Sequence, residues 1–204
     1  MADPIAEHLG LVEHVRTLGP DVDAVARALI GVYEGDGRLF AFGNGGSSCD
    51  AQHLAEELIA RYRRERRPLA ATSLSADAAA LTCIGNDFGF DEVFSRQVEA
   101  LVRAGDMVVG FSTSGRSQNV IRGLAAARRR GAVTVLLGGG QGGPARDHAD
   151  HALVVPSTDT ARVQEMHVLL LHLIVDQVDA WASGDGASGD GASGDGAAGD
   201  EAAG

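Results

Sequence analysis

The chain has 204 residues, of which 45% are hydrophobic and 22% charged, enough for one domain with a hydrophobic core. All 17 basic residues are arginine and stand against 28 Asp and Glu, so the formal net charge is -11. The lack of lysine excludes Schiff-base catalysis, a pyridoxal-phosphate anchor and a phosphate-loop lysine. The acidic balance argues against general binding of nucleic acid.

The first 35 residues predict two helices, because apolar side chains recur every three to four positions from Ile5 and again after Pro20. Short apolar runs then alternate with helical stretches. Strands are expected at residues 38–42, 68–73, 107–111, 133–137 and 151–155. Helices are expected at residues 47–62, 77–84, 91–102, 117–130 and 160–181. This alternation predicts an α/β domain with a parallel sheet that is covered on both faces.

The domain is expected to span residues 1–182. Residues 183–204 repeat Ser or Ala with Gly-Asp-Gly-Ala and carry five acids and no base, a composition that predicts a flexible, disordered acidic tail. Two cysteines form no disulfide framework, the N-terminus does not read as a signal peptide, and no run of about 18 apolar residues could span a membrane. We therefore expect a cytoplasmic protein with no membrane partner.

Two segments rich in glycine and serine, residues 43–48 and 112–117, follow the first and third strands. Both fall at the carboxyl edge of the sheet, where such folds bind ligands, and each opens a helix whose free N–H groups suit an anion. Hydroxyl groups add donors, so the set suits a phosphate monoester; they belong to Ser112, Thr113, Ser114 and Ser117. Serine also caps helices, so either loop alone has a purely structural alternative.

Two predicted helices, at residues 47–62 and 160–181, carry side chains suited to acid–base or metal chemistry. His53 and Glu57 are four residues apart on one helix face, where they can bind a metal, exchange protons or only form a surface hydrogen bond. His172 lies in an apolar run of the last helix, where a histidine is often a satisfied core residue, and the same holds for His167.

Several segments, in this order, resemble the phosphoheptose isomerases of the sugar-isomerase (SIS) family: residues 44–58 with 61–63, 85–90, 94–99, 112–117 and 162–167. The similarity spans roughly residues 5–182. It implies a three-layer αβα sandwich with a five-stranded parallel sheet, a flavodoxin-like SIS fold with N-terminal helices added. It also implies a homotetramer that converts D-sedoheptulose 7-phosphate to D-glycero-D-manno-heptose 7-phosphate through an enediolate.

The resemblance also implies roles for individual residues. One zinc ion per subunit would be held by His53, Glu57, Gln164 and His172, with Glu57 and His172 as the acid–base pair. Substrate contacts fall on Asn44, Gly45, Gly46, Glu57, Asn86, Asp87, Ser112, Thr113, Ser114, Ser117 and Gln164. An acid that the family commonly has three residues before the glutamine is replaced by Ala161, with Asp159 close by.

The spacing of two implied ligands raises a geometric question. Gln164 and His172 are eight residues apart, which is about 12 Å along a regular helix and roughly 80° around it. Either long side chains converge on one ion from both directions, or the two residues serve sites shared between subunits; we favour active sites at subunit interfaces. Two alternatives stay open: a non-catalytic SIS module that binds a sugar phosphate or a replication-initiation protein, and an isomerase of another phosphorylated sugar. The run 138–143 is richer in glycine than any of these functions obviously requires.

Overall fold

The computed structural model describes residues 3–184, so all but the first two residues of the predicted tail at 183–204 lie outside the described residues. The helices in this part of the chain are α1 (Pro4–Thr17), α2 (Gly19–Glu34), α3 (Gly46–Ile59), α4 (Ala78–Phe88), α5 (Ser95–Leu101), α6 (Gln118–Arg129) and α7 (Thr160–Ser183). The strands are β1 (Leu39–Gly43), β2 (Ala71–Ser73), β3 (Met107–Ser112), β4 (Val133–Gly139) and β5 (His151–Val155). Short 3-10 turns cover Phe90–Glu92 and Pro144–His148.

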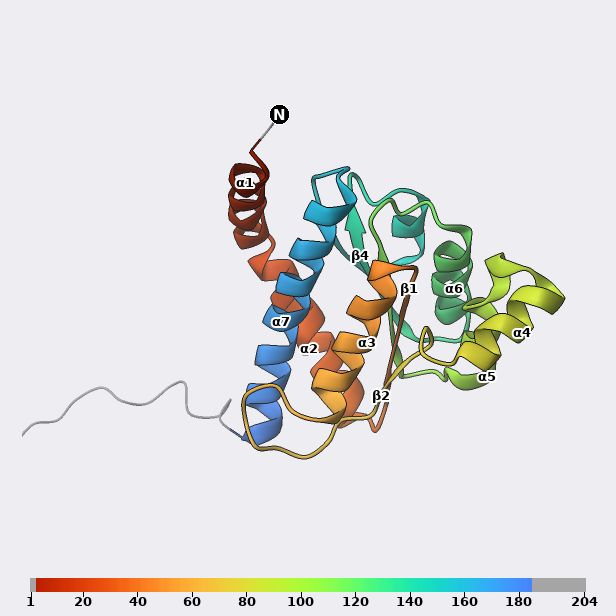
Figure 1. Cartoon of the computed structure of the whole chain (residues 1–204). Helices are drawn as coiled ribbons and strands as arrows, with labels where there is room; N and C mark the ends of the chain where they lie inside the picture. Colours follow the sequence, from red (N-terminus) through yellow and green to blue (C-terminus); the bar gives the residue numbers. More distant parts are fainter. Residues whose placement is uncertain (1–2, 185–204) are drawn as a thin grey trace, which may run out of the picture.

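The strands form one parallel sheet in the order β2-β1-β3-β4-β5, which confirms the predicted α/β class. Alternate residues of β1 enter different cores: Leu39 packs with α2, α3 and α7, whereas Phe40 packs with α5 and α6. Because both faces are buried, the strand reads as a continuous apolar run. Figure 1 shows the resulting three layers, with α3 and α7 side by side on one face and α6 on the other.

Three elements are shorter than the sequence predicts by three residues or more. One is α5, which begins at Ser95 rather than residue 91, because a 3-10 turn covers Phe90–Glu92. Helix α3 ends at Ile59 rather than residue 62, and the guanidinium of Arg66 donates to the carbonyl oxygens of Glu57 and Leu58 at this end. Strand β2 covers only the last three residues of the predicted run 68–73. It is one of the two edge strands, and Pro68 at the start of the run has no N–H to donate to a neighbour.

Helix α1 lies against the first half of α7, where Nδ1 of His8 and a carboxylate oxygen of Glu165 are 2.8 Å apart. Its opposite side leaves Ile5 and Leu9 exposed. Within residues 3–184, no helix combines the length and apolar character needed to cross a bilayer.

Candidate active site

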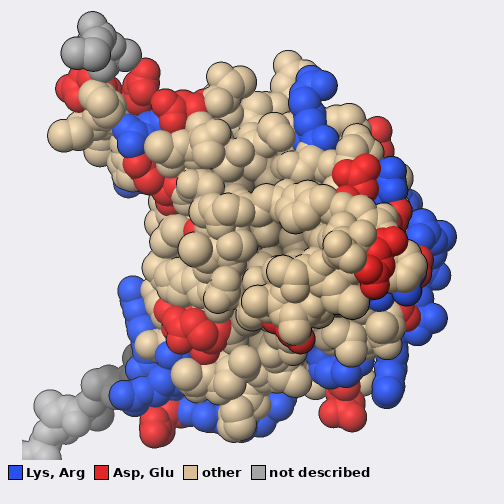
Figure 2. Space-filling view, turned by 45° about the vertical axis from the view of Figure 1, so that its right-hand side comes forward, with Lys and Arg blue, Asp and Glu red and all other residues tan. Residues whose placement is uncertain are grey.

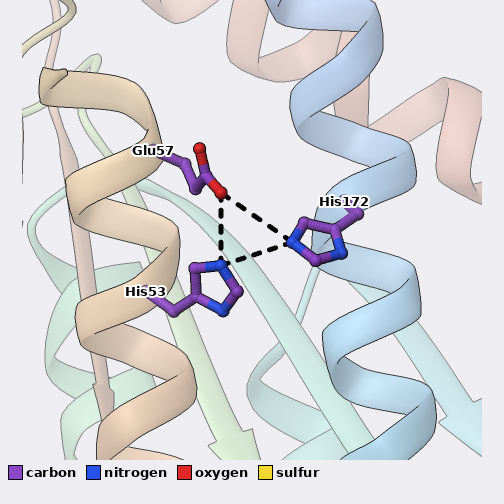
Figure 3. A group of neighbouring side chains, drawn as sticks. All are labelled: His53, Glu57 and His172. Carbon is purple, nitrogen blue, oxygen red and sulfur yellow. Dashed lines mark hydrogen bonds and ion pairs between the residues drawn. The ribbon is translucent and has the colours of Figure 1, made fainter. Parts of the chain in front are cut away.

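A cluster of two histidines and one glutamate lies between α3 and α7 (Figure 3). His53 and Glu57 occupy successive turns of α3, and 3.2 Å separate Nε2 of the histidine from Oε1 of the glutamate. His172 reaches them from α7, with its Nε2 3.3 Å from Nε2 of His53 and 3.8 Å from Oε1 of Glu57. The fold thus brings three of the predicted site residues together within one chain.

His172 is not the satisfied core residue that its apolar neighbours allowed, because its side chain is 31% exposed. Its partial burial and the nearby His53 lower the pKa of the His172 imidazole. The ring stacks on Tyr62, with centroids 5.4 Å apart and planes 24° apart. A neutral imidazole in a fixed plane is the form that binds a metal or accepts a proton. In the sequence, Tyr62 stands out only as part of the motif 61–63, and its contact with His172 depends on tertiary packing.

The three facing atoms suit a divalent metal such as zinc. Two imidazole nitrogens and one carboxylate oxygen are a common zinc donor set, and ligands of a tetrahedral zinc ion lie about 3.3–3.6 Å from one another. The three ligand atoms here all lie within 4.8 Å of one another, and the pairwise distances of 3.2, 3.3 and 3.8 Å bracket that spacing. Without a cation or a shared proton, these acceptor atoms would repel each other at such distances.

Gln164, the fourth implied ligand, lies further toward the start of α3. Its Nε2 is 3.5 Å from Oγ of Ser47, about two turns of α3 before His53. A Cβ atom at Gly46 would come within 2.5 Å of the same amide, so only glycine leaves room for this side chain. The eight-residue spacing therefore separates Gln164 from His172 as expected. The expectation that active sites lie at subunit interfaces stays a prediction.

The two glycine- and serine-rich loops meet at the carboxyl edge of the sheet, because β1 and β3 are paired neighbours. Between them and α7 lies a pocket of about 310 Å³. Its lining includes seven of the predicted substrate residues: Asn44, Gly45, Gly46, Ser112, Thr113, Ser117 and Gln164. Ser114 borders a neighbouring cavity instead. Hydroxyls and the N–H groups at the start of two helices give this pocket the character of an anion site.

Asn119 is a buried residue that sequence reasoning missed. Its side-chain amide exchanges two hydrogen bonds with that of Asn44, at 2.8 and 2.9 Å, and so joins the first loop to the start of α6. It is only 2% exposed. The only sequence signal for Asn119 is an asparagine near a predicted helix start. This signal is weak, since asparagine is common at helix caps for local reasons.

Asn86 and Asp87 are not near the loops in this chain. Both lie at the end of α4, where the Asn86 amide donates to the Asp87 carboxylate at 2.7 Å. No residue of α4 is buried, and neither Asn86 nor Asp87 lines the pocket between the loops. Figure 1 shows α4 at the opposite side of the molecule from α7.

Three further polar residues have clear structural positions. Asp159, considered near the missing acid at Ala161, instead caps α7, its Oδ1 accepting from the backbone N–H of Ala161 at 2.8 Å. His167 is the core histidine that the sequence allowed: it is fully buried, and burial lowers its pKa to about 4. Its Nε2 lies 3.3 Å from the carbonyl oxygen of Gly138, whereas its buried Nδ1 has no hydrogen-bond partner among residues 3–184. Asp50 is 7% exposed, and burial raises its pKa to about 6 despite the opposing effect of His53.

Comparisons with known proteins agree with this geometry. The SIS domain family model matches residues 5–139. The chain is 48% identical over 176 residues to the phosphoheptose isomerase of Geobacter metallireducens, covering 86% of this chain and 93% of that protein. The solved phosphoheptose isomerase of Neisseria gonorrhoeae superposes with a TM-score of 0.81 at 42% identity, covering 86% of this chain and 95% of that one. That of Francisella tularensis superposes with a TM-score of 0.79 at 34% identity, covering 82% of this chain and 90% of that one. The chain therefore belongs to the phosphoheptose isomerase family of SIS-domain enzymes.

Proposed function

We propose that this isomerase converts D-sedoheptulose 7-phosphate to D-glycero-D-manno-heptose 7-phosphate. The observation that carries the proposal is the placement of Glu57 and His172, whose oxygen and nitrogen atoms face each other 3.8 Å apart from adjacent helices. The names of the relatives supply the substrate class, a phosphorylated heptose. The pocket between the two loops supports the same substrate, since it offers donors for a phosphate group.

The substrate phosphate is assigned to the loop after β3 and to the start of α6. Ser112 and Ser117 would donate hydroxyl hydrogen bonds to it, together with the N–H groups of the helix start. Asn44 and Gln164 would then contact the sugar hydroxyls, because both line the same pocket. These assignments place the phosphate at one end of the α3–α7 pair and the acid–base cluster further along it.

The reaction moves a carbonyl from C2 to C1. The Glu57 carboxylate would take a proton from C1 to give the enediolate, and would return it to C2 to form the aldose. The His172 imidazole would move the second proton from the C1 hydroxyl to the C2 oxygen, and its lowered pKa leaves it free to accept that proton at neutral pH. Each group ends the cycle in the state in which it began.

His53, Glu57 and His172 would hold one zinc ion per subunit. Gln164, the fourth ligand that the family resemblance implies, lies beside Ser47 instead and would contact the substrate in the adjoining pocket. When bound, the ion supplies positive charge that stabilises negative charge on the substrate oxygens. Glu57 has two carboxylate oxygens, so one can serve the ion while the other faces the substrate carbon. His53 would then act as a ligand and orient Glu57 through their 3.2 Å contact.

The position of α4 supports a homotetramer with active sites at subunit interfaces. This helix is rich in apolar residues yet fully buries none of them: Leu81 and Ile84 pack only partly against the core, and Phe88 at its end is 52% exposed. Figure 2, turned so that the right-hand side of Figure 1 comes forward, shows a broad area without charged side chains. We propose that this area is buried against another copy, where Asn86 and Asp87 would contact a neighbouring subunit's pocket. Sizing chromatography tests this: a fully active monomer would contradict it.

The decisive experiment is an assay of the purified chain with sedoheptulose 7-phosphate, with and without a chelator and with zinc restored afterwards. We expect turnover that falls on chelation and returns with zinc. Binding of the heptose phosphate without turnover at any zinc level would instead favour a non-catalytic sugar-phosphate module. Turnover of a different phosphorylated sugar alone would overturn the substrate assignment and leave the reaction class in place.

A further inference from the structure

The glycine-rich run after β4 builds a second cavity that the proposed reaction does not use. This cavity has a volume of about 650 Å³ and adjoins the serine loop, which also lines the pocket described above. Its lining is formed by Thr113, Ser114, Arg116, Gly139, Gly140, Gln141, Gly143, Arg146, Asp147 and Thr158. Only Thr113 lines both spaces.

The glycines are needed because two loops pack backbone against backbone here. A Cβ atom at Gly115 would come within 1.8 Å of the carbonyl oxygen of Gly142, and one at Gly139 within 2.2 Å of the carbonyl oxygen of Thr113. Gly142 and Gly143 also have φ values of 87° and 54°, which disfavour other residues. The run thus holds the wall of the cavity directly against the serine loop.

Two arginine side chains border this cavity without partners. Among residues 3–184, neither the Arg116 nor the Arg146 guanidinium makes a hydrogen bond or ion pair, although Asp147 also lines the cavity. The stem of Arg146 packs over Gly142, where a Cβ atom would lie 3.1 Å from it. In a chain with a net charge of -11, two unpaired guanidinium groups at one concave site favour an anion.

We propose that this cavity is a second binding site, distinct from the catalytic one, for a small phosphorylated polyol. One guanidinium group can bind two phosphate oxygens at once. The Thr158 hydroxyl and the Gln141 side-chain amide suit sugar hydroxyls. The residues that line it include no aromatic ring, so the site offers no stacking surface for a nucleotide base. Its volume lies within the range of about 300–1,000 Å³ typical of small-molecule sites.

Calorimetric titration of the full chain with two probes, inorganic pyrophosphate and D-fructose 1,6-bisphosphate, tests the proposal. We expect both to bind, the sugar bisphosphate at least as tightly, and both more weakly as salt is added. Arg146→Gln and Arg116→Gln should each weaken binding by about tenfold or more, since a charged hydrogen bond is lost. Arg103→Gln, a change at an exposed arginine that does not line the cavity, is the matched control.

Ser117→Ala distinguishes the two sites, because Ser117 lines only the pocket assigned to the substrate. The second site predicts that this change removes at most the probe binding at the substrate pocket and leaves the arginine-dependent binding intact in a folded protein. Loss of binding in Ser117→Ala with retention in both arginine variants would overturn the proposal, as would a failure of both probes to bind at low salt. Tighter binding of pyrophosphate than of the sugar bisphosphate would overturn the polyol assignment. None of these outcomes depends on whether the chain isomerises a heptose.

Discussion

Near the end of α7, Asp179 forms an ion pair with Arg66, and both side chains are completely buried. Two turns earlier on the same helix, His172 faces His53 and Glu57 with its side chain 31% exposed. The Asp179 carboxylate accepts hydrogen bonds from the backbone N–H groups of two neighbouring residues and from Nε of Arg66. Its charge and its acceptor capacity are therefore met within the fold.

The histidine–glutamate cluster is built in the opposite way. Its two imidazole nitrogens and one carboxylate oxygen point at a common space, where only a cation or a proton satisfies all three. A buried polar cluster that closes on itself stabilises the fold, whereas one that leaves acceptors facing each other is open to a ligand. The comparison separates a structural ion pair from a candidate catalytic site on one helix.

The largest effect is expected for Glu57→Gln, which keeps the shape of the side chain but removes the proposed base. Turnover should fall by about 10²–10⁴-fold, the usual contribution of general acid–base catalysis. Glu56→Gln, at the exposed neighbouring position, is the matched control and should keep full turnover. Steady-state assays with thermal melting of both variants make the test. Substantial activity in folded Glu57→Gln protein would contradict the assigned role.

Asp179→Asn should destabilise the fold and leave the chemistry unchanged per folded molecule. It leaves the Arg66 charge buried without its partner, at a cost of about 3–5 kcal/mol. Asp176→Asn removes a carboxylate that is 41% exposed and should cost only about 0–1 kcal/mol. Denaturant unfolding of the two variants measures the difference. If Asp179→Asn and Asp176→Asn had equal free energies of unfolding, the buried Arg66–Asp179 pair would not have the structural role assigned to it.

His53→Gln should weaken zinc binding by about tenfold or more, because substituting even a residue that only hydrogen-bonds to a metal ligand has an effect of that size. His148→Gln is the matched control: it also replaces one histidine by glutamine, but in the 3-10 turn Pro144–His148. Zinc content after dialysis and the rise in melting temperature on adding zinc are the two measurements. If both variants retain the wild-type zinc content, the metal site lies elsewhere.

The buried pair also predicts a pH effect. Burial raises the pKa of Asp179, but hydrogen bonds from the backbone of Arg64 and Arg63 and from Arg66 outweigh this, and the net pKa is lowered. A lowered pKa stabilises the fold above the ordinary aspartate value, and this stability is lost as the pH falls through the folded-state value. The gap between wild type and Asp179→Asn should therefore be constant at neutral pH and narrow below about pH 4. If the difference in unfolding free energy between the two proteins grew as the pH fell, the Asp179 pKa would not be lowered in the folded state.

The smallest effect is expected from deleting residues 185–204, which lie outside the described residues. Because the proposed catalytic groups all belong to α3 and α7, turnover with sedoheptulose 7-phosphate should not change. Matched assays of the full and shortened chains at equal protein concentration check this. A large loss of turnover would assign the acidic repeat a role in the reaction.

The sequence by itself determined the alternation of strands and helices, the two loops at the carboxyl edge and the pairing of His53 with Glu57. These features follow from local periodicity and from the position of turns, which a linear pattern records. It also showed that Gln164 and His172 begin about 12 Å apart along one helix, which raised the question of how both could serve one ion.

Only the tertiary structure decided which distant residues meet. The contact of His172 with His53, the amide pair of Asn44 and Asn119 and the Arg66–Asp179 ion pair each join segments more than 70 residues apart. Such contacts depend on how helices pack across the sheet, which local patterns do not encode. The same holds for the cavity beside Gly139–Gly143, because a wall made by two loops exists only once the strands before them have paired.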